Sequence, residues 1–193
     1  MKQARARIFG GDTRAEGKLL SLFEPSTEII RKGKAAKPNE FGKMVKLQEA
    51  ENQIVIDYEV YDRRPNDADL LIPAIETHRA RLGRAPYLVA ADAAFYSGKN
   101  EAAAKAKGVK RVCVPNRSTK SPERKREQKK RWCRNGQKWR TGSEGRISVV
   151  KRRHGLDRCR YKGDSGMRRW VGLGVIGDNL VTLGNALAKT PNR

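Results

Sequence analysis

Residues 87–115 read YLVAADAAFYSGKNEAAAKAKGVKRVCVP, and this stretch decides the fold. Its first five residues, from Tyr87, form a short apolar run that predicts a strand buried on both faces and ending at Asp92. Residues 109–114 form a second apolar run and predict the next strand.

A helix is expected between these two strands. Ser97 predicts its N-cap, the alanine-rich sequence continues to Lys107, and Gly108 predicts its end. Strand, helix and strand in this order predict two parallel strands joined by a right-handed connection.

The flanking sequence extends this pattern. Alternating apolar residues over 43–61 predict a β-hairpin. Asp67 or Asp69 is expected to cap a helix that ends at Gly83. Leucines and isoleucines at helical spacing predict a core helix near the C-terminus, and they are Leu173, Ile176, Leu180, Leu183 and Leu187. The order β-β-α-β-α-β, with C-terminal helices, indicates the α/β class.

Two regions are expected along the chain. Residues 1–40 are rich in Gly, Lys and Pro and are interpreted as an arm or linker, with one short apolar piece at Leu19–Phe23. Residues 41–190 carry the periodic patterns and are interpreted as one partial domain.

The charge points to nucleic acid. The 193 residues carry a formal net charge of +22, and residues 109–170 hold 22 lysines and arginines against 5 acids. Such a concentration is typical of a DNA- or RNA-binding protein. A membrane partner is not expected, because the longest apolar run, Val171–Ile176, is far short of a span. The N-terminus lacks the apolar core of a signal peptide, so a cytoplasmic protein is expected.

The cysteines predict neither a disulfide framework nor a zinc site. Cys113, Cys133 and Cys159 are odd in number and widely spaced, which argues against disulfides and against a standard zinc site. His154 and Cys159 would supply only half of a metal site.

One isolated acid lies among the cations. At about 100° per residue, Arg140, Glu144 and Lys151 fall within roughly 40° of one another on a continuous helix. The plain alternative is a solvated face in which acid and base pair at i and i+4. The scarcity of acids here favours a functional carboxylate. Arg140 and Lys151 would then hold phosphates, with Ile147 and Val150 turned toward the sheet.

Asp92 is the expected partner of Glu144. In open α/β sheets, ligands gather beyond the carboxyl ends of parallel strands, where Asp92 is placed. Asp92 and Glu144 could hold one divalent cation, with their carboxylates roughly 4 to 8 Å apart. A third carboxylate would complete a two-metal site for displacement at phosphorus.

Further cations and two tryptophans are candidate DNA contacts. Tryptophans among cations suit stacking on bases as well as anchoring in a core. The predicted DNA-binding residues are Lys138, Arg140, Arg146, Lys151, Arg152, Arg153, Trp132 and Trp139.

These motifs resemble a known family. From about Leu19 to Leu187, the chain resembles the C-terminal part of the catalytic domain of DDE insertion-sequence transposases, in stretches such as RPNDADLL, VAADAAFYS and GQKWRTGSEGRISVVKRRHGLDRCRYKGD. The family signature is tyrosine, two residues, arginine, three residues, glutamate, six residues, lysine, and Arg140, Glu144 and Lys151 match its last three members. The resemblance implies a ribonuclease H-like mixed sheet, Mg²⁺ (or Mn²⁺) as cofactor, and DNA strand cleavage and transfer during transposition. It also implies DNA partners (element ends and target), a bacterial or archaeal, nucleoid-associated location, and allows a homodimer of the intact protein.

The chain departs from the family at two places. Gln137 stands at the tyrosine position. The family's first catalytic aspartate lies on a strand before the hairpin, where this sequence shows no clear strand ending in aspartate, and Asp57 lies inside the hairpin. The resemblance therefore predicts a truncated copy, with impaired catalysis and negligible metal-dependent DNA cleavage.

Two other functions fit part of the pattern. A non-catalytic basic nucleic-acid binder would use only residues 109–170. Asp92 facing Glu144 argues against this function, because both carboxylates would repel phosphate unless a metal ion lay between them. A repair or resolvase-type nuclease on the same fold is excluded only by the signature.

Overall fold

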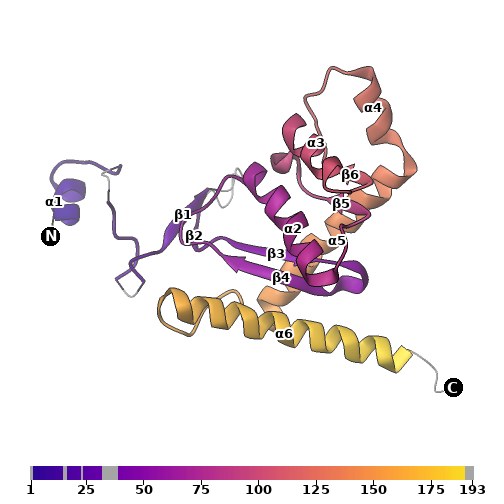
Figure 1. The fold of residues 1–193 in the computed structure, drawn as a ribbon. Coiled ribbons are helices and arrows are strands. Elements are labelled where there is room, and N and C mark those ends of the chain that lie inside the picture. The colour runs from indigo at the N-terminus through magenta and orange to yellow at the C-terminus, as the bar shows by residue number, and fades with distance from the viewer. Residues whose placement is uncertain (1, 15–16, 23, 32–38, 190–193) are drawn as a thin grey trace.

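A computed structural model describes residues 2–14, 17–22, 24–31 and 39–189. The chain has an N-terminal arm, a hairpin, a βαβ unit and two long helices (Figure 1). The arm contains α1 (Lys2–Ile8), β1 (Glu28–Arg31) and β2 (Asn39–Gly42), and β1 pairs with β2 antiparallel. The predicted piece Leu19–Phe23 forms no strand over Leu19–Leu22, and Phe23 lies outside the described residues.

The predicted hairpin is confirmed. Strand β3 (Val45–Glu49) pairs antiparallel with β4 (Val55–Val60), with an irregular register between Gln48 and Glu49. The connecting turn holds η1 (Glu51–Gln53), in which Asn52 and Gln53 have positive φ.

The predicted capping of the next helix is wrong. Asp67 and Asp69 lie in a short 3-10 turn, η2 (Asp67–Leu70), which leads directly into α2 (Leu71–Leu82) without a side-chain cap. The predicted end is confirmed, since Gly83 has a φ of 70° and its N–H bonds back to Arg79, as a helix stop requires.

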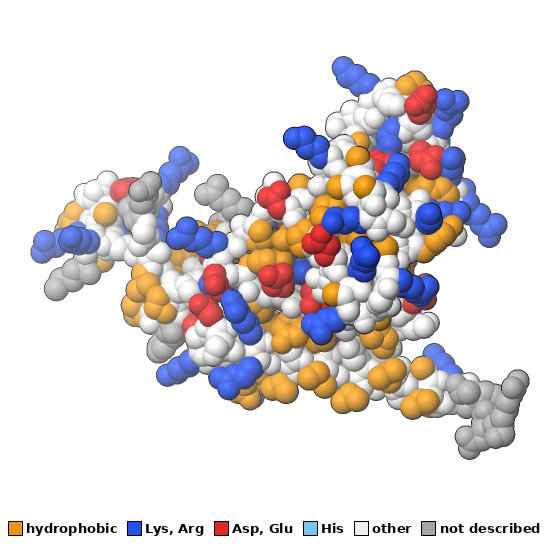
Figure 2. All heavy atoms as spheres, in the orientation of Figure 1, with side chains coloured by type: hydrophobic (Ala, Val, Ile, Leu, Met, Phe, Trp, Pro, Cys, Tyr) orange, Lys and Arg blue, Asp and Glu red, His pale blue; other side chains and the backbone are white. Residues whose placement is uncertain are grey.

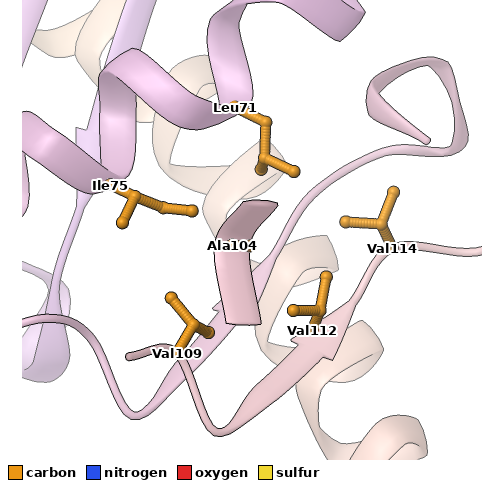
Figure 3. Close-up of a cluster of buried hydrophobic side chains, with 6 residues drawn as sticks. All are labelled: Leu71, Ile75, Ala104, Val109, Val112 and Val114. Atoms are coloured by element: carbon orange, nitrogen blue, oxygen red, sulfur yellow. The ribbon is translucent and has the colours of Figure 1, made fainter. Parts of the chain in front are cut away.

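The βαβ unit is confirmed. Strand β5 (Leu88–Ala90) is followed by η3 (Ala93–Phe95), α3 (Gly98–Ala106) and β6 (Arg111–Cys113), which pairs parallel with β5. Ser97 caps α3 by accepting the Asn100 N–H at 3.0 Å. Figure 3 shows the core that α2, α3 and β6 share, formed by Leu71, Ile75, Ala104, Val109, Val112 and Val114.

A single mixed sheet is not formed by the described residues. The three strand pairs β1-β2, β3-β4 and β5-β6 are separate two-stranded sheets. The architecture is therefore mixed α/β with small sheets and C-terminal helices, because β3 and β5 do not hydrogen-bond to each other.

The basic region is helical. Helix α4 (Pro122–Lys129) is capped by Ser121 and leads into α5 (Arg131–Arg153), which packs on β5 and β6. Arg124 fixes α4 in place, since it pairs with Glu101 at 2.5 Å, donates to the Val114 carbonyl at 2.8 Å, and lies 5.0 Å from the Tyr96 ring centroid.

The last helix, α6 (Gly163–Lys189), lies along the β3-β4 hairpin (Figure 1). The Asn179 side chain joins it to β4 through two hydrogen bonds to the Val55 backbone. Its packed face is not the predicted one. The buried residues are Gly166, Val171, Gly172, Gly174, Val175 and Asp178. The predicted core leucines and isoleucine are each at least half exposed, and Figure 2 shows apolar side chains along the free edge of this helix.

Close packing explains why the glycine-containing face of α6, and not its leucine face, is the buried one. An added Cβ at Gly172 would meet the Tyr58 hydroxyl, and one at Gly174 would meet the Leu156 side chain. Helix α6 is also long and apolar enough to cross a membrane. This corrects the sequence-based expectation that no segment is long enough for a span, which considered only the run Val171–Ile176. The same helix packs on the hairpin and carries a buried, paired carboxylate, as a helix of a folded domain does.

Candidate nucleic-acid interface and acid pair

Helix α5 carries the predicted triplet on one continuous helix, as the spacing indicated. Arg140 donates to Glu144 at 2.6 Å, and the Glu144 side chain is 59% exposed. The i,i+4 ion pair considered as the plain alternative is therefore present. Lys151, in the last turn of the helix, is exposed and forms no ion pair within the described part of the chain.

Gln137 takes a structural role at the position where the signature has tyrosine. Its amide donates to the Cys113 carbonyl at the end of β6 at 2.8 Å, and its oxygen accepts from Arg140 Nε at 3.3 Å. The end of β6, Gln137, Arg140 and Glu144 thus form one chain of hydrogen bonds. No signal in the sequence indicated that Gln137 would position Arg140.

The orientation predicted for the helix is half right. Val150 is fully buried, as expected, whereas Ile147 is 42% exposed and lines an open cavity. This cavity has a volume of about 780 Å³ and lies between β3, α2, β5 and α5. Asp92, Arg140 and Glu144 also line it, so the two predicted acids face the same space.

Asp92 lies where the sequence placed it, just beyond the end of β5. Its carboxylate accepts the Ala93 N–H at 2.6 Å and caps η3. The 4 to 8 Å separation from Glu144 stays a prediction.

The acids of the described residues do not complete a metal site. Over the ranges described, no three or more His, Cys, Asp or Glu side chains gather closely enough to hold an ion. Glu144 is engaged by Arg140 and Asp92 by its own turn. A two-ion site needs more carboxylate than this pair supplies, so the arrangement described here does not fit two metal ions.

Glu49 is an acid of the same cavity that the sequence did not single out. Burial raises the pKa of its carboxyl above the ordinary value, while the charge of Arg146 and hydrogen bonds from Ser143 and Trp139 act in the opposite direction. It therefore joins β3 to α5. The irregular register that places it there is not visible in the strand pattern.

Arg146, whose contact with DNA stays a prediction, is engaged within the protein. Its guanidinium donates to both oxygens of Asp178, at 2.9 and 3.1 Å, and to Thr182 at 3.1 Å. Only 12% of the side chain is exposed, because the pair bridges α5 and α6. His154 also faces Asp178 at 3.5 Å, so it is part of this buried network.

The tryptophans are partly engaged within the protein. The guanidinium of Arg111 lies 5.4 Å from the Trp132 ring centroid and 5.3 Å from that of Tyr87. Trp132, Arg111, Arg131 and Trp139 line a second, open hollow of about 570 Å³. Arg111 is a further basic residue beside an aromatic ring that the sequence did not single out.

The remaining predicted contacts are available to a ligand. Lys138, Lys151, Arg152 and Arg153 are exposed on α5, and none of them forms an ion pair with another described residue. The 23-residue helix therefore presents cations along most of its length, with Glu144 as its only acid.

Comparison with known proteins agrees with this assignment. Residues 99–183 match the model of a family described as the transposase DDE domain. No curated protein and no solved structure matches the chain. The matched residues include β6, α4, α5 and most of α3 and α6, with Arg140, Glu144 and Lys151 among them. Residues 99–183, a little under half of the chain, are therefore similar to the transposase DDE domain family.

Proposed function

We propose that the chain binds DNA through α5 as part of a transposase catalytic domain. The single observation that carries this proposal is the row of exposed, unpaired cations on the helix that holds the family signature. A transposase domain acts on DNA, and phosphates are the natural partners of such cations.

Within that function, Asp92, Glu144, Arg140 and Lys151 are our proposed catalytic residues. Asp92 and Glu144 face one cavity beyond β5 and would be the metal ligands, with Mg²⁺ or Mn²⁺ supplying charge neutralisation at phosphorus. Lys151 would hold a phosphate beside them. Glu144 would have to leave Arg140 to reach a metal, so Arg140 keeps this acid in place until then.

The ribonuclease H-like sheet belongs to the same proposal. The order of the hairpin and the parallel βαβ pair supports it, and so does the family match over residues 99–183. Joining them into one sheet would require a strand between β3 and β5.

The test of DNA binding is its dependence on salt. Binding of labelled duplex DNA, followed by fluorescence anisotropy between about 50 and 200 mM salt, should weaken steeply. Lys151→Ala should reduce the slope of log K against log salt by about one contact. Lys105→Ala is the matched control, because Lys105 is paired with Glu101 on α3, and its slope should match the wild-type slope. Equal slopes for all three proteins would contradict the proposed α5 interface.

A further inference from the structure

The open hollow along the first half of α5 differs in charge from the cavity of Asp92 and Glu144. We name it the tryptophan hollow, and its lining residues are Leu88, Arg111, Arg131, Trp132, Asn135, Gly136 and Trp139. None of these lining residues is acidic, and the sequence holds no acid between Glu127 and Glu144. The cavity between β3 and β5, in contrast, is lined by several carboxylates. An anionic ligand therefore meets cations and no carboxylate among the residues that line the tryptophan hollow.

The tryptophan hollow lies at the amino ends of the two parallel strands. Leu88 begins β5 and Arg111 begins β6, whereas Asp92 lies beyond the carboxyl end of β5. Leu88 and Trp139 line both spaces, so they form the wall between the hollow and the cavity of the acids. A ligand in the hollow would therefore lie beside the proposed metal ligands and not on them.

Trp132 has a binding group that the protein itself does not use. Its ring is partly buried and lies 5.4 Å from the Arg111 guanidinium. Its indole N–H donates no hydrogen bond within the described part of the chain, although such groups usually find a partner when buried. Trp170 shows the contrast, because its N–H donates to the Gly155 carbonyl at 2.8 Å and its ring packs edge-on against Tyr161. Trp132 is thus available to a ligand, whereas Trp170 serves the fold.

The groups around Trp132 match the parts of a nucleotide. Trp132, Asn135 and Trp139 recur at three- and four-residue spacing, so they lie on one face of α5. Aromatic rings stack on bases, and the exposed Asn135 amide can both donate to and accept from the edge of a base. Arg131 is exposed and forms no ion pair with another described residue, so its guanidinium is free for a phosphate.

The base that stacks in the hollow has to be unpaired. In duplex DNA the neighbouring pairs cover both faces of each base, so a base reaches a protein ring only when it leaves the stack or belongs to a single strand. The volume of the hollow, about 570 Å³, lies within the range of about 300–1,000 Å³ typical of small-ligand sites. It is therefore large enough for a nucleotide.

We propose that the tryptophan hollow binds an unpaired base of single-stranded DNA, stacked on Trp132, with Arg131 on an adjacent phosphate. The proposal rests on the proposed function, because it assigns a single-stranded part to the DNA that α5 holds. It adds a site at the amino ends of β5 and β6, where base faces and not only phosphates are bound.

The first test compares strands that differ only in their bases. A labelled dT strand of about 12 nucleotides and an abasic strand of equal length are titrated with the protein and followed by fluorescence anisotropy. The dT strand should bind about 5- to 150-fold more tightly, a range set by stacking energies of about 1–3 kcal/mol per base. Equal affinities for the two strands would overturn the proposal. Tighter binding of an rU strand of equal length than of the dT strand would overturn the assignment to DNA.

The second test changes the ring. Trp132→Leu and Trp132→Phe both keep an apolar side chain at this partly buried position, but only the phenylalanine keeps a face for stacking. Trp132→Leu should lose the preference for the dT strand over the abasic strand, and Trp132→Phe should keep most of it. Trp170→Phe is the matched control, since Trp170 packs on Tyr161 and does not line the hollow, and it should keep the wild-type preference. Equal preferences in Trp132→Leu and Trp132→Phe would overturn the role of the ring. Unchanged binding of the abasic strand shows that a variant is still folded, because that strand is held through its phosphates.

Binding of duplex DNA separates this proposal from the proposed function. Duplex DNA is held through its phosphates, so Trp132→Leu and the wild type should bind it equally and with the same salt dependence. Salt-dependent duplex binding without a preference for the dT strand would overturn the hollow alone. Loss of duplex binding would contradict the proposed function, and a base preference that survives it would still support the hollow as a site for single strands.

Discussion

Arg146 Nη1 donates to both carboxylate oxygens of Asp178, and this buried ion pair joins α5 to the last helix, α6. Breaking such a pair leaves an uncompensated buried charge, which typically costs about 3–5 kcal/mol. We therefore expect Arg146→Ala to lower the free energy of unfolding by that amount in urea titrations.

Arg140→Ala is the matched control on the same helix. Its partner Glu144 is mostly exposed, and surface pairs at i and i+4 contribute about 0.5 kcal/mol or less. Similar losses for both variants would show that the Asp178 network is not a stabilising core. A loss of DNA binding in Arg146→Ala without loss of stability would restore Arg146 as a DNA contact.

Gly136 sets the distance between α5 and the parallel strands. An added Cβ would come within 2.9 Å of Cys113 Sγ and 3.2 Å of its Cβ. Gly136→Ala should cost about 1–3 kcal/mol through overpacking. Gly142→Ala, on the same helix with nothing nearby, should be neutral or stabilise by up to about 1 kcal/mol. Thermal unfolding of both variants decides whether the α5 packing is as described.

The thiols give a prediction about reactivity. Cys113 and Cys133 are buried with their sulfurs 3.3 Å apart, and both are free. Burial, together with the neighbouring Cys113, raises the pKa of the Cys133 thiol to about 12. Because the thiolate is the reactive form, Cys133 should resist alkylation at pH 8 in the folded protein. Mass spectrometry should show Cys159 modified first, and modification of Cys133 at the same rate would contradict the packing.

Much of the fold was predictable because local signals were strong. Ser97 and Gly83 are cap residues whose chemistry acts within one turn, and both occupy the expected positions. The two parallel strands follow from the same local order. The ion pair of Arg140 with Glu144 likewise follows from helical spacing alone.

The rest depended on contacts between distant segments. Helix α6 has two apolar faces, and the spacing of Leu180 and Leu183 could not show that the face with Gly172 and Gly174 packs closer to the hairpin. The sequence does not distinguish Arg146 from the other cations of α5, because its partner Asp178 lies 32 residues later in the chain. The gap between β3 and β5 is likewise a property of the assembled chain.

Glu49 predicts a pH dependence of stability. Burial raises the pKa of its carboxyl in the folded protein, so the folded state binds more protons than the unfolded state as the pH passes upward from the ordinary value of 4.5. The free energy of unfolding should therefore fall with rising pH over that window because of this residue. Glu49→Gln should remove part of that fall and be relatively more stable at neutral pH. Parallel pH profiles for the two proteins in urea titrations would contradict the burial of Glu49.

The last prediction concerns DNA cleavage and follows from the acids that line the cavity between β3 and β5. Only Asp92 and Glu144 serve as proposed metal ligands there, so the chain should show negligible nicking of labelled duplex DNA with Mg²⁺ or Mn²⁺. Binding of the same DNA, followed in parallel by fluorescence anisotropy, should persist, because it rests on the exposed cations of α5. Efficient nicking that is lost in Asp92→Asn would show that another acid is the third ligand, with Asp12 and Asp57 the first to replace.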